Sequence, residues 1–451
     1  MSELKLTGIF AGAAIVLALV AWALSPGRVT PEAFMDQGEL FFPSFTDPNQ
    51  AKSLEVIEYD QDAGAARPFK VEFKNGRWTI PSHHNYPADG EERLAKTAAG
   101  VIDIRKDDYR TNLVSEHEAC GVIDPLDQDA VSLTGRGSRI TIRGEGGEVL
   151  ADFIVGKEVP DRPGFRFVRI PDQNRVYASK MNLDISTKFT DWIKTNLLDV
   201  KARDIEQIVI DNYSINERNY SIIPGEKTDL RRKDFVWSTN SLGGGELDTA
   251  KVSRLTKALE ELEIVGVRPK PQGLSGALKG DGKAELTQAD QISLQNKGFY
   301  IARESGGLLS NEGELKAYTD KGVIYTLRFG EVLYGSGLAV SAGGSADESE
   351  AGQEGQQANR YLFITAEFNE GYFREPKKPN SLDFQQKADS LWSVADQTNH
   401  ALYTAHKEWE DRVNNGRQTA AGLNDRFADW YYVISEDSYK KIHLSHAQLK
   451  K

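Results

Sequence analysis

Cysteine is nearly absent from this sequence: among its 451 residues there is one, Cys120. A single cysteine cannot close an intrachain disulfide, and it cannot provide the several thiolates of a structural zinc site. Free cysteines usually behave as small buried apolar residues. We therefore expect Cys120 to pack in a core and not to act as a nucleophile.

Positive charge is scarce relative to negative charge. The chain has 55 Lys and Arg residues against 67 Asp and Glu residues, which gives a net charge of −12. This balance repels phosphate backbones, so we do not expect nucleic acid as a partner. With 39% hydrophobic and 27% charged residues, the composition is that of a folded chain.

The sequence also lacks the short motifs that mark common active sites. It contains no Gly-x-Ser-x-Gly elbow, no His-Glu-x-x-His pair and no phosphate-binding loop. His400 and His406 would lie about 120° apart on one helix and could not share a metal ion. His443 and His446 have a spacing compatible with one helical face, but no carboxylate follows them at ligand spacing, so we expect a solvated tail there. We expect no catalytic, cofactor-binding or metal-binding residue, no cofactor, and no enzymatic activity.

One long apolar run is present, at residues 6–24, and it contains no charged residue. As a helix it would span about 28 Å, close to the thickness of a bilayer core. A Ser-Pro-Gly stop follows at residues 25–27. We predict an N-terminal transmembrane helix within residues 1–28, either an anchor or an uncleaved signal, and cleavage after the small-x-small residues 21–23 is the open alternative.

The orientation of this predicted span depends on few charges. Lys5 favours an amino end inside the cell. We therefore expect a single-pass protein of the inner (cytoplasmic) membrane, with the bulk of the chain on the periplasmic side.

Internal similarity is the most informative pattern. The first copy has strand-like residues 54–59, 69–73 and 78–80, followed by a helix that begins near Asp89. The second copy has, in the same order, residues 205–210, 220–223 and 235–238 and a helix that begins near Asp248. Three further pairs follow downstream: residues 149–156 with 323–330, 166–170 with 360–364, and 176–179 with 433–436. We predict two repeat units, residues 50–200 and 201–451.

The second unit contains two insertions. Residues 341–358 are small, polar and acidic, which predicts a flexible loop. Residues 375–426 predict a helical insertion, which Gly416 and Gly422 break into separate helices. Its apolar residues recur at alternating steps of four and three, which is typical of a seam for another surface. The partner-docking candidates on this seam are Phe384, Leu391, Leu402 and Trp409; packing on its own domain is the alternative.

The predicted fold class is therefore α+β. It is a tandem duplicated unit of mainly antiparallel sheet plus one helix, with an N-terminal transmembrane helix and a helical insertion in the second unit.

The order of several short motifs resembles a known family. They are Val56-Ile57-Glu58, Gly76-Arg77-Trp78-Thr79-Ile80, Pro87-Ala88-Asp89, Cys120-Gly121-Val122-Ile123-Asp124-Pro125, Val155-Gly156-Lys157 and Arg175-Val176-Tyr177. From about residue 6 to residue 445 the chain resembles the bacterial domain of unknown function 4340, whose members are single-span envelope proteins with repeated units. Cys120 departs from the pattern, in which an aromatic residue would precede the glycine.

The resemblance implies an accessory role outside the membrane, beside gliding-motility-type ABC transporter subunits, and it implies no catalytic residue. We expect a non-enzymatic, membrane-anchored extracytoplasmic accessory or scaffold protein. Its expected partner is a protein of the membrane or envelope, such as an ABC transporter subunit. The alternatives are an envelope hydrolase, which would need a cleft of carboxylates or histidines, and a purely structural envelope spacer.

Overall fold

The computed structural model describes residues 13–18, 20, 36–194, 196–216, 218, 221–280, 286–302, 306–335, 337–343 and 358–451. The chain divides into two compact units, residues 1–68 with 94–185 and residues 69–93 with 186–451. Most of the predicted acidic loop, residues 344–357, lies outside the described residues.

The predicted N-terminal transmembrane helix is not supported, and the fold class is corrected on this point. A span needs about 20 consecutive apolar residues in one helix. Of residues 6–24, only 13–18 and 20 are described, and these are helical. Within the described part of the chain, no helix is both long enough and apolar enough to cross a membrane. What remains of the fold is mostly antiparallel sheet with several helices.

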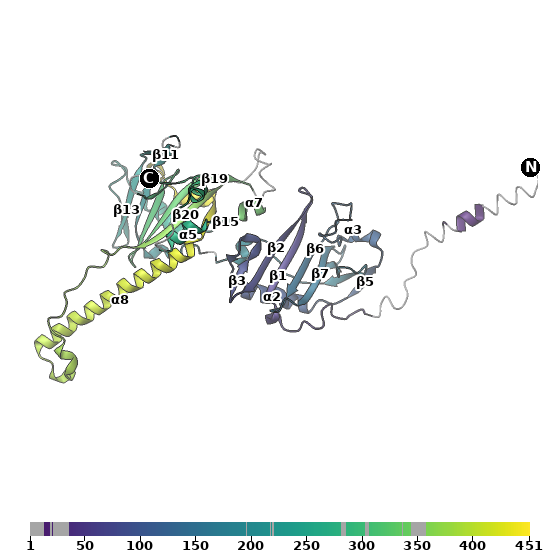
Figure 1. Cartoon of the computed structure of the whole chain (residues 1–451), viewed down its shortest axis with the longest axis horizontal. Coiled ribbons are helices and arrows are strands. Elements are labelled where there is room, and N and C mark those ends of the chain that lie inside the picture. The colour runs from purple at the N-terminus through teal and green to yellow at the C-terminus, as the bar shows by residue number, and fades with distance from the viewer. Residues whose placement is uncertain are drawn as a thin grey trace, which may run out of the picture. The chain divides into compact units, whose positions relative to one another are not determined.

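The first sheet has nine strands in the order β4-β3-β2-β1-β6-β7-β8-β9-β5 (Figure 1). Their bounds are β1 Ser53–Asp60, β2 Ala65–Lys74, β3 Arg77–Ile80, β4 Tyr86–Pro87, β5 Asp108–Thr111, β6 Ser138–Arg143, β7 Val149–Glu158, β8 Phe165–Arg169 and β9 Val176–Lys180. Helix α2 (Glu91–Ile102) connects β4 to β5 and buries Leu94, Ala98 and Val101. The short helix α3 (His117–Cys120) precedes β6.

The second sheet has eight strands in the order β14-β13-β10-β18-β19-β20-β21-β15. Their bounds are β10 Ile205–Asp211, β13 Lys227–Lys233, β14 Val236–Ser238, β15 Gly266–Pro269, β18 Glu314–Thr319, β19 Val323–Tyr334, β20 Ala358–Phe368 and β21 Trp430–Ser435. Two ribbons stand apart from it, β11 (Ser214–Asn216) with β12 (Ser221–Ile223) and β16 (Phe299–Ile301) with β17 (Leu308–Ser310). The helices are α4 Thr249–Glu260, α5 Gln272–Leu278, α6 Gln288–Gln295, α7 Gly337–Ser341, α8 Val394–Ala428, α9 Glu436–Ile442 and α10 His446–Leu449.

The described residues also include short 3-10 turns. They are Pro48–Gln50, Pro81–His83, Val114–Glu116, Phe189–Trp192, Ala202–Asp204, Asp383–Gln386 and Asp389–Leu391.

The two sheets share one strand order. Strands β3, β2, β1, β6, β7, β8, β9 and β5 of the first sheet occupy the places of β14, β13, β10, β18, β19, β20, β21 and β15 of the second. Within the described residues, β4 has no counterpart. In both sheets a helix precedes, along the chain, the last strand of this series: α2 comes before β5, and α4 comes before β15. The resemblance between the two halves of the sequence thus extends to the topology.

One predicted segment pair is wrong. Residues 220–223 were expected to match the second strand of the first copy, but the described part of that segment belongs to the separate β11–β12 ribbon. The sheet position beside β10 is occupied by β13 instead, with Leu230 opposite Ile208. The ribbon is an insertion between two strands of the sheet, and its apolar residues imitate the pattern of a sheet strand.

Local sequence explains where α4 begins and which face it buries. The carboxylate of its N-cap residue, Asp248, accepts hydrogen bonds from the backbone N–H groups of Ala250 and Lys251. These bonds satisfy donors that have no partner inside the helix. Val252, Leu255 and Leu259 follow at helical spacing and are buried. The opposite face therefore remains free to carry charged residues.

Cys120 lies in the apolar core that the sequence predicted for it. It is 2% exposed, in a cluster with Val122, Ile154, Phe167, Val176 and Ala178. Burial raises the pKa of its thiol. A thiol in such surroundings is a poor nucleophile because the thiolate form is disfavoured.

We predict that Trp237→Ala lowers the free energy of unfolding by about 3 kcal/mol, as is usual when a large buried ring is removed. The Trp237 side chain is buried in β14. The matched control is Phe235→Ala, because Phe235 lies in the same hairpin but is 90% exposed. Urea denaturation of both variants checks the prediction, and equal losses in the two would contradict it.

Candidate functional site

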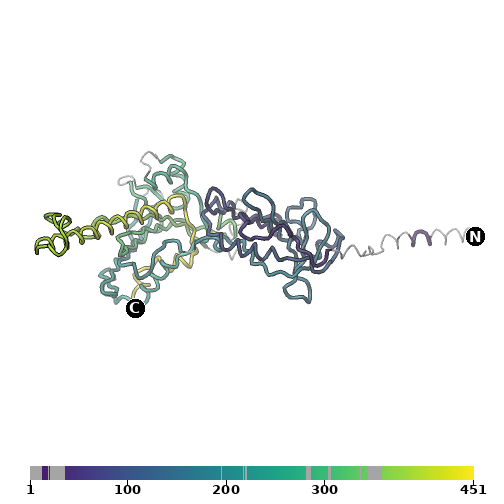
Figure 2. Tube along the Cα trace, turned by 90° about the horizontal axis from the view of Figure 1, so that it is seen from below, coloured from purple at the N-terminus to yellow at the C-terminus, as the bar shows by residue number. Residues whose placement is uncertain are grey.

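Helix α8 is the longest helix in the described part of the chain. It has 35 residues and, at about 1.5 Å per residue, is about 52 Å long. Apart from Asp396, its buried residues all lie in its last 16 positions: Val413, Gly416, Ala420, Leu423, Phe427 and Ala428. Figures 1 and 2 both show the rest of α8 extending well beyond the eight-stranded sheet. The sheet therefore covers less than half of the helix.

The carboxyl-terminal part of α8 packs closely on β20. A side chain at position 416 would overlap the ring of Phe368, so glycine is required there for close approach. The Asn424 side chain accepts a hydrogen bond from the Ala366 backbone N–H at 2.9 Å. The predicted break at Gly416 and Gly422 is therefore wrong, because α8 is continuous through both residues. Gly416 serves the contact with the sheet instead.

The segment that connects β20 to α8 runs outward alongside the projecting part of the helix. The indole N–H of Trp409 donates to the Phe373 carbonyl at 3.0 Å, and the guanidinium of Arg412 lies over the Phe373 ring at 5.2 Å. Farther out, the Asn380 backbone N–H donates to the Asn399 side chain at 3.0 Å. We call residues 369–393 the outgoing segment. We call residues 369–412, which are this segment together with the projecting half of α8, the arm.

A small aromatic cluster closes the end of the arm. Phe384 is 3% exposed. Its ring packs edge-on against those of Trp392, His400 and Tyr403, at centroid distances of 5.8, 5.4 and 5.7 Å. The Trp392 indole N–H donates to the Phe384 carbonyl at 3.1 Å. The arm therefore ends in a packed core of its own.

Polar contacts hold this end to the start of α8. Ser393 and Asp396 form a capping box, which satisfies backbone donors of the first helical turn. The Lys387 ammonium group pairs with the Asp396 carboxylate at 2.9 Å. These hydrogen bonds, that of Lys387 first, lower the pKa of Asp396 from 3.8 to about 2.

Three apolar side chains at the end of the arm lie outside this small core. Leu382 is 49% exposed, Leu391 is 73% exposed and Val394 is 80% exposed. We call these three residues the tip patch. Exposed apolar residues that gather at the end of a projecting element are a common mark of a binding surface.

The structure separates the four predicted docking residues. Phe384 is buried in the aromatic cluster, Leu402 and Trp409 are half-buried on α8, and Leu391 is exposed in the tip patch. The prediction that these four residues lie on one continuous helix is wrong, because α8 begins only at Val394. Leu382 and Val394 were missed, since the pattern of fours and threes passes over both. The docking role itself stays a prediction.

The histidines considered as metal ligands contact aromatic rings or a carboxylate instead. His400 packs in the aromatic cluster, and His406 lies 3.3 Å from the Glu375 carboxylate. His443 stacks on Tyr439, and burial lowers its pKa. In the described ranges of the chain, no group of three or more His, Cys, Asp or Glu residues is arranged to hold a metal ion.

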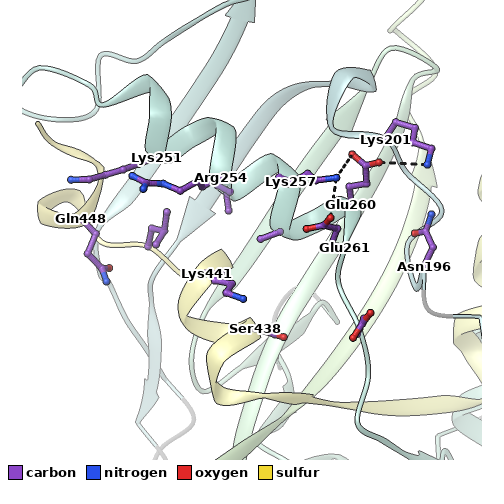
Figure 3. A pocket seen from close by; sticks show the side chains of 14 residues that line it. Asn196, Lys201, Lys251, Arg254, Lys257, Glu260, Glu261, Ser438, Lys441 and Gln448 are labelled. Carbon is purple, nitrogen blue, oxygen red and sulfur yellow. Dashed lines mark hydrogen bonds and ion pairs between the residues drawn. The ribbon is translucent and has the colours of Figure 1, made fainter. Parts of the chain in front are cut away.

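A charged cleft is the second candidate, and the sequence did not indicate it. It has a volume of about 870 Å³ and lies beside α4, with α9 and the chain leading into α10 on the other side (Figure 3). Its lining residues are Asn196, Lys201, Lys251, Arg254, Leu255, Lys257, Ala258, Glu260, Glu261, Glu263, Ser438, Lys441, Leu444 and Gln448. We call this site the α4–α9 cleft.

At one end of the cleft, Glu260 and Glu261 are paired with bases, and a third acid, Glu263, also lines the cleft. Lys257 lies 2.9 Å from the Glu261 carboxylate and 3.9 Å from that of Glu260. Glu260 also faces Lys201 at 3.5 Å and accepts a hydrogen bond from the Ala202 backbone N–H at 3.1 Å.

The other end carries Lys251 and Arg254, together with Gln448, and Lys441 lies between the two ends (Figure 3). Lys251 has partners, since its ammonium group donates to the Lys450 carbonyl at 2.6 Å and lies 3.7 Å from Asp248. Arg254 and Lys441 are both exposed, and in the part of the chain that the structure describes neither forms an ion pair, although Arg254 acts electrostatically on the Asp248 carboxylate. Lys251 and Arg254 therefore make this end of the cleft the more basic one.

With the geometry established, comparison with known proteins identifies one similarity. Residues 78–277 match a family described as a domain of unknown function (DUF4340). The resemblance stated from the sequence is confirmed over these residues, a narrower range than the predicted 6–445. No match was found to a curated protein or to a solved structure. The DUF4340 match ends in α5, so it includes α4 but not α8, α9 or α10.

We predict that Asp396→Ala loosens the end of the arm without changing the stability of the sheet. The variant loses both the capping box and the ion pair with Lys387. Amide hydrogen exchange over residues 384–400 should become faster at neutral pH, with an unchanged melting temperature. Asp389→Ala is the control, because Asp389 is exposed in the same region; equal effects in both would contradict the prediction.

The same carboxylate predicts a pH dependence. Because its pKa is lowered from 3.8 to about 2, the charged form stabilises the folded end of the arm. This stabilisation is complete above pH of about 4 and is lost as the pH falls through about 2. Hydrogen exchange of the wild-type arm, measured at pH values across this window, should show it.

Proposed function

We propose that this chain is a non-catalytic module that binds a protein partner through the tip patch. The observation that carries the proposal is the exposure of Leu391 and Val394, 73% and 80%, at the end of a helix that runs far beyond its sheet. Burying apolar surface against a partner favours association because it removes that surface from water. A projecting apolar end that its own domain leaves uncovered is suited to insertion into a groove of another protein.

The organisation of the arm supports this function. Phe384, Trp392 and the Lys387–Asp396 pair hold the end of the arm in one conformation. Little conformational entropy is then lost when a partner binds, because the side chains are already ordered. The outgoing segment also keeps Trp409 and Leu402 half-buried, so the exposed apolar surface is concentrated at the tip.

The resemblance to DUF4340 supports the choice of partner. We take the partner to be a protein of the bacterial envelope, such as a subunit of an ABC-type transporter complex, met on the periplasmic side. The chain would act as an accessory or scaffold there and would not transform a substrate. The charge of −12 fits a protein partner better than a nucleic acid.

Site-specific photo-crosslinking in the native cells tests the proposal. A crosslinker at Leu391 should give one major protein adduct, which mass spectrometry identifies. A crosslinker at Gln418, which is exposed on the sheet-covered half of α8, should not give that adduct. The same adduct at both positions, or none at Leu391, would contradict tip docking.

The double variant Leu391→Asp/Val394→Asp should reduce adduct formation about tenfold or more when the crosslinker is moved to Leu382. Charges placed in an apolar contact would be desolvated and unpaired in the complex, which weakens binding. Asn414→Asp/Gln418→Asp is the matched control, since it adds the same charge at two exposed positions of α8. Equal thermal stability of both variants would show that the loss is one of binding.

A further inference from the structure

The α4–α9 cleft has both an apolar and a basic part in its lining. Leu255, which is 1% exposed, Ala258 and Leu444 supply an apolar part of the lining. Arg254 and Lys441 add positive charges from two different helices, α4 and α9. Both side chains are exposed at the rim of the cleft, and since the chain as a whole has a net charge of −12, this basic part is a local departure from its average.

The topology alone does not create this cleft. In the first sheet the chain that follows β9 lies directly on α2, so that a Cβ atom added to Gly100 would meet Leu183 at 3.1 Å. The Thr97 hydroxyl donates to the Asp184 carbonyl at 3.0 Å, and Lys96 pairs with the Asp184 carboxylate at 3.0 Å. In the second sheet the chain that follows β21 continues as α9, and the equivalent space is open.

The basic residues of the two helices differ in their partners. Helix α4 carries Lys251, Arg254 and Lys257 at steps of three, and all three line the cleft. Helix α2 carries Arg93 and Lys96 at the same step, but each pairs with a carboxylate, that of Asp191 at 3.4 Å and that of Asp184 at 3.0 Å. Only beside the open space of the second sheet do the described residues leave a base of this series, Arg254, without an ion pair.

We propose that the α4–α9 cleft binds a small organic molecule that carries a phosphate or carboxylate group on an apolar body. The guanidinium of Arg254 offers a planar pair of donors that fits such an oxyanion, and Lys441 adds a second positive charge. The apolar body lies along Leu255, Ala258 and Leu444. This site is separate from the tip patch, so the inference does not depend on the proposed docking function.

The end of the cleft with Glu260, Glu261 and Glu263 limits what the ligand can be. Lys257 and Lys201 already compensate Glu260, and Lys257 also compensates Glu261. A second strong anion at that end would compete with these pairs, so one anionic group per ligand is expected. Hydrogen-bonding groups at the far end of the ligand are compatible with the side chains of Asn196 and Ser438.

Isothermal titration calorimetry on the full chain tests the proposal with three probes: hexyl phosphate, hexanoate and inorganic phosphate. At least one of the two alkyl anions should bind at a single site, and more tightly than inorganic phosphate. Added salt should weaken the binding, because the contact is partly ionic. If inorganic phosphate binds as tightly as the alkyl anions, or if no probe binds at millimolar concentration, the proposal is overturned.

The decisive comparison uses two charge-matched double variants. Arg254→Gln/Lys441→Gln should weaken binding of the alkyl anion about tenfold or more, since two charged contacts are lost. Lys407→Gln/Lys440→Gln removes the same charge from exposed positions outside the cleft lining and should leave the affinity unchanged. Equal weakening in both would mean that only the overall charge matters, which overturns the site. Thermal unfolding of both variants checks that each one folds.

Discussion

The close packing of α8 on β20 is the contact on which the arm depends. Gly416 allows the helix axis to approach the ring of Phe368, and the Asn424 side chain accepts a hydrogen bond from the backbone N–H of Ala366. Because these contacts hold the last 16 residues of α8, the remaining part of the helix is carried outward as a rigid extension. The outgoing segment contacts Trp409, Arg412 and Asn399 of this extension, so one side of the projecting helix is packed against protein.

The two sheets show how one topology can serve different purposes. Their strand orders agree, and in each a helix, α2 or α4, precedes the edge strand β5 or β15 along the chain. In the second sheet, insertions between these shared elements supply the β11–β12 ribbon, the segment from α5 to β17 and the arm. Both candidate sites lie in this second part, where the chain has departed from the common pattern. The first sheet keeps the plainer form, in which residues 182–184 close the space beside α2.

Much of the sheet architecture could be predicted because strand and helix patterns are local. Alternating residues 54–59 and 205–210 became β1 and β10, and Asp248 became the cap of α4. The segment at 220–223 misled the prediction, because an inserted ribbon alternates in the same way as a sheet strand. Gly416 and Gly422 misled it too, because glycine lowers helix stability locally while tertiary packing can require it. The uncharged residues 6–24 predicted a transmembrane helix, which the described residues do not contain.

The sequence by itself determined the periodic elements, the burial of Cys120, the repeat and the resemblance to DUF4340, because each depends on residues close together in the chain. Only the tertiary structure decided which apolar residues of the arm are covered. Phe384 and Leu391 look alike in a pattern of fours and threes, yet one lies in a core and the other is exposed. Likewise, Arg254 and Lys441 come together through folding alone, since 187 positions separate them in the sequence and no local pattern relates them.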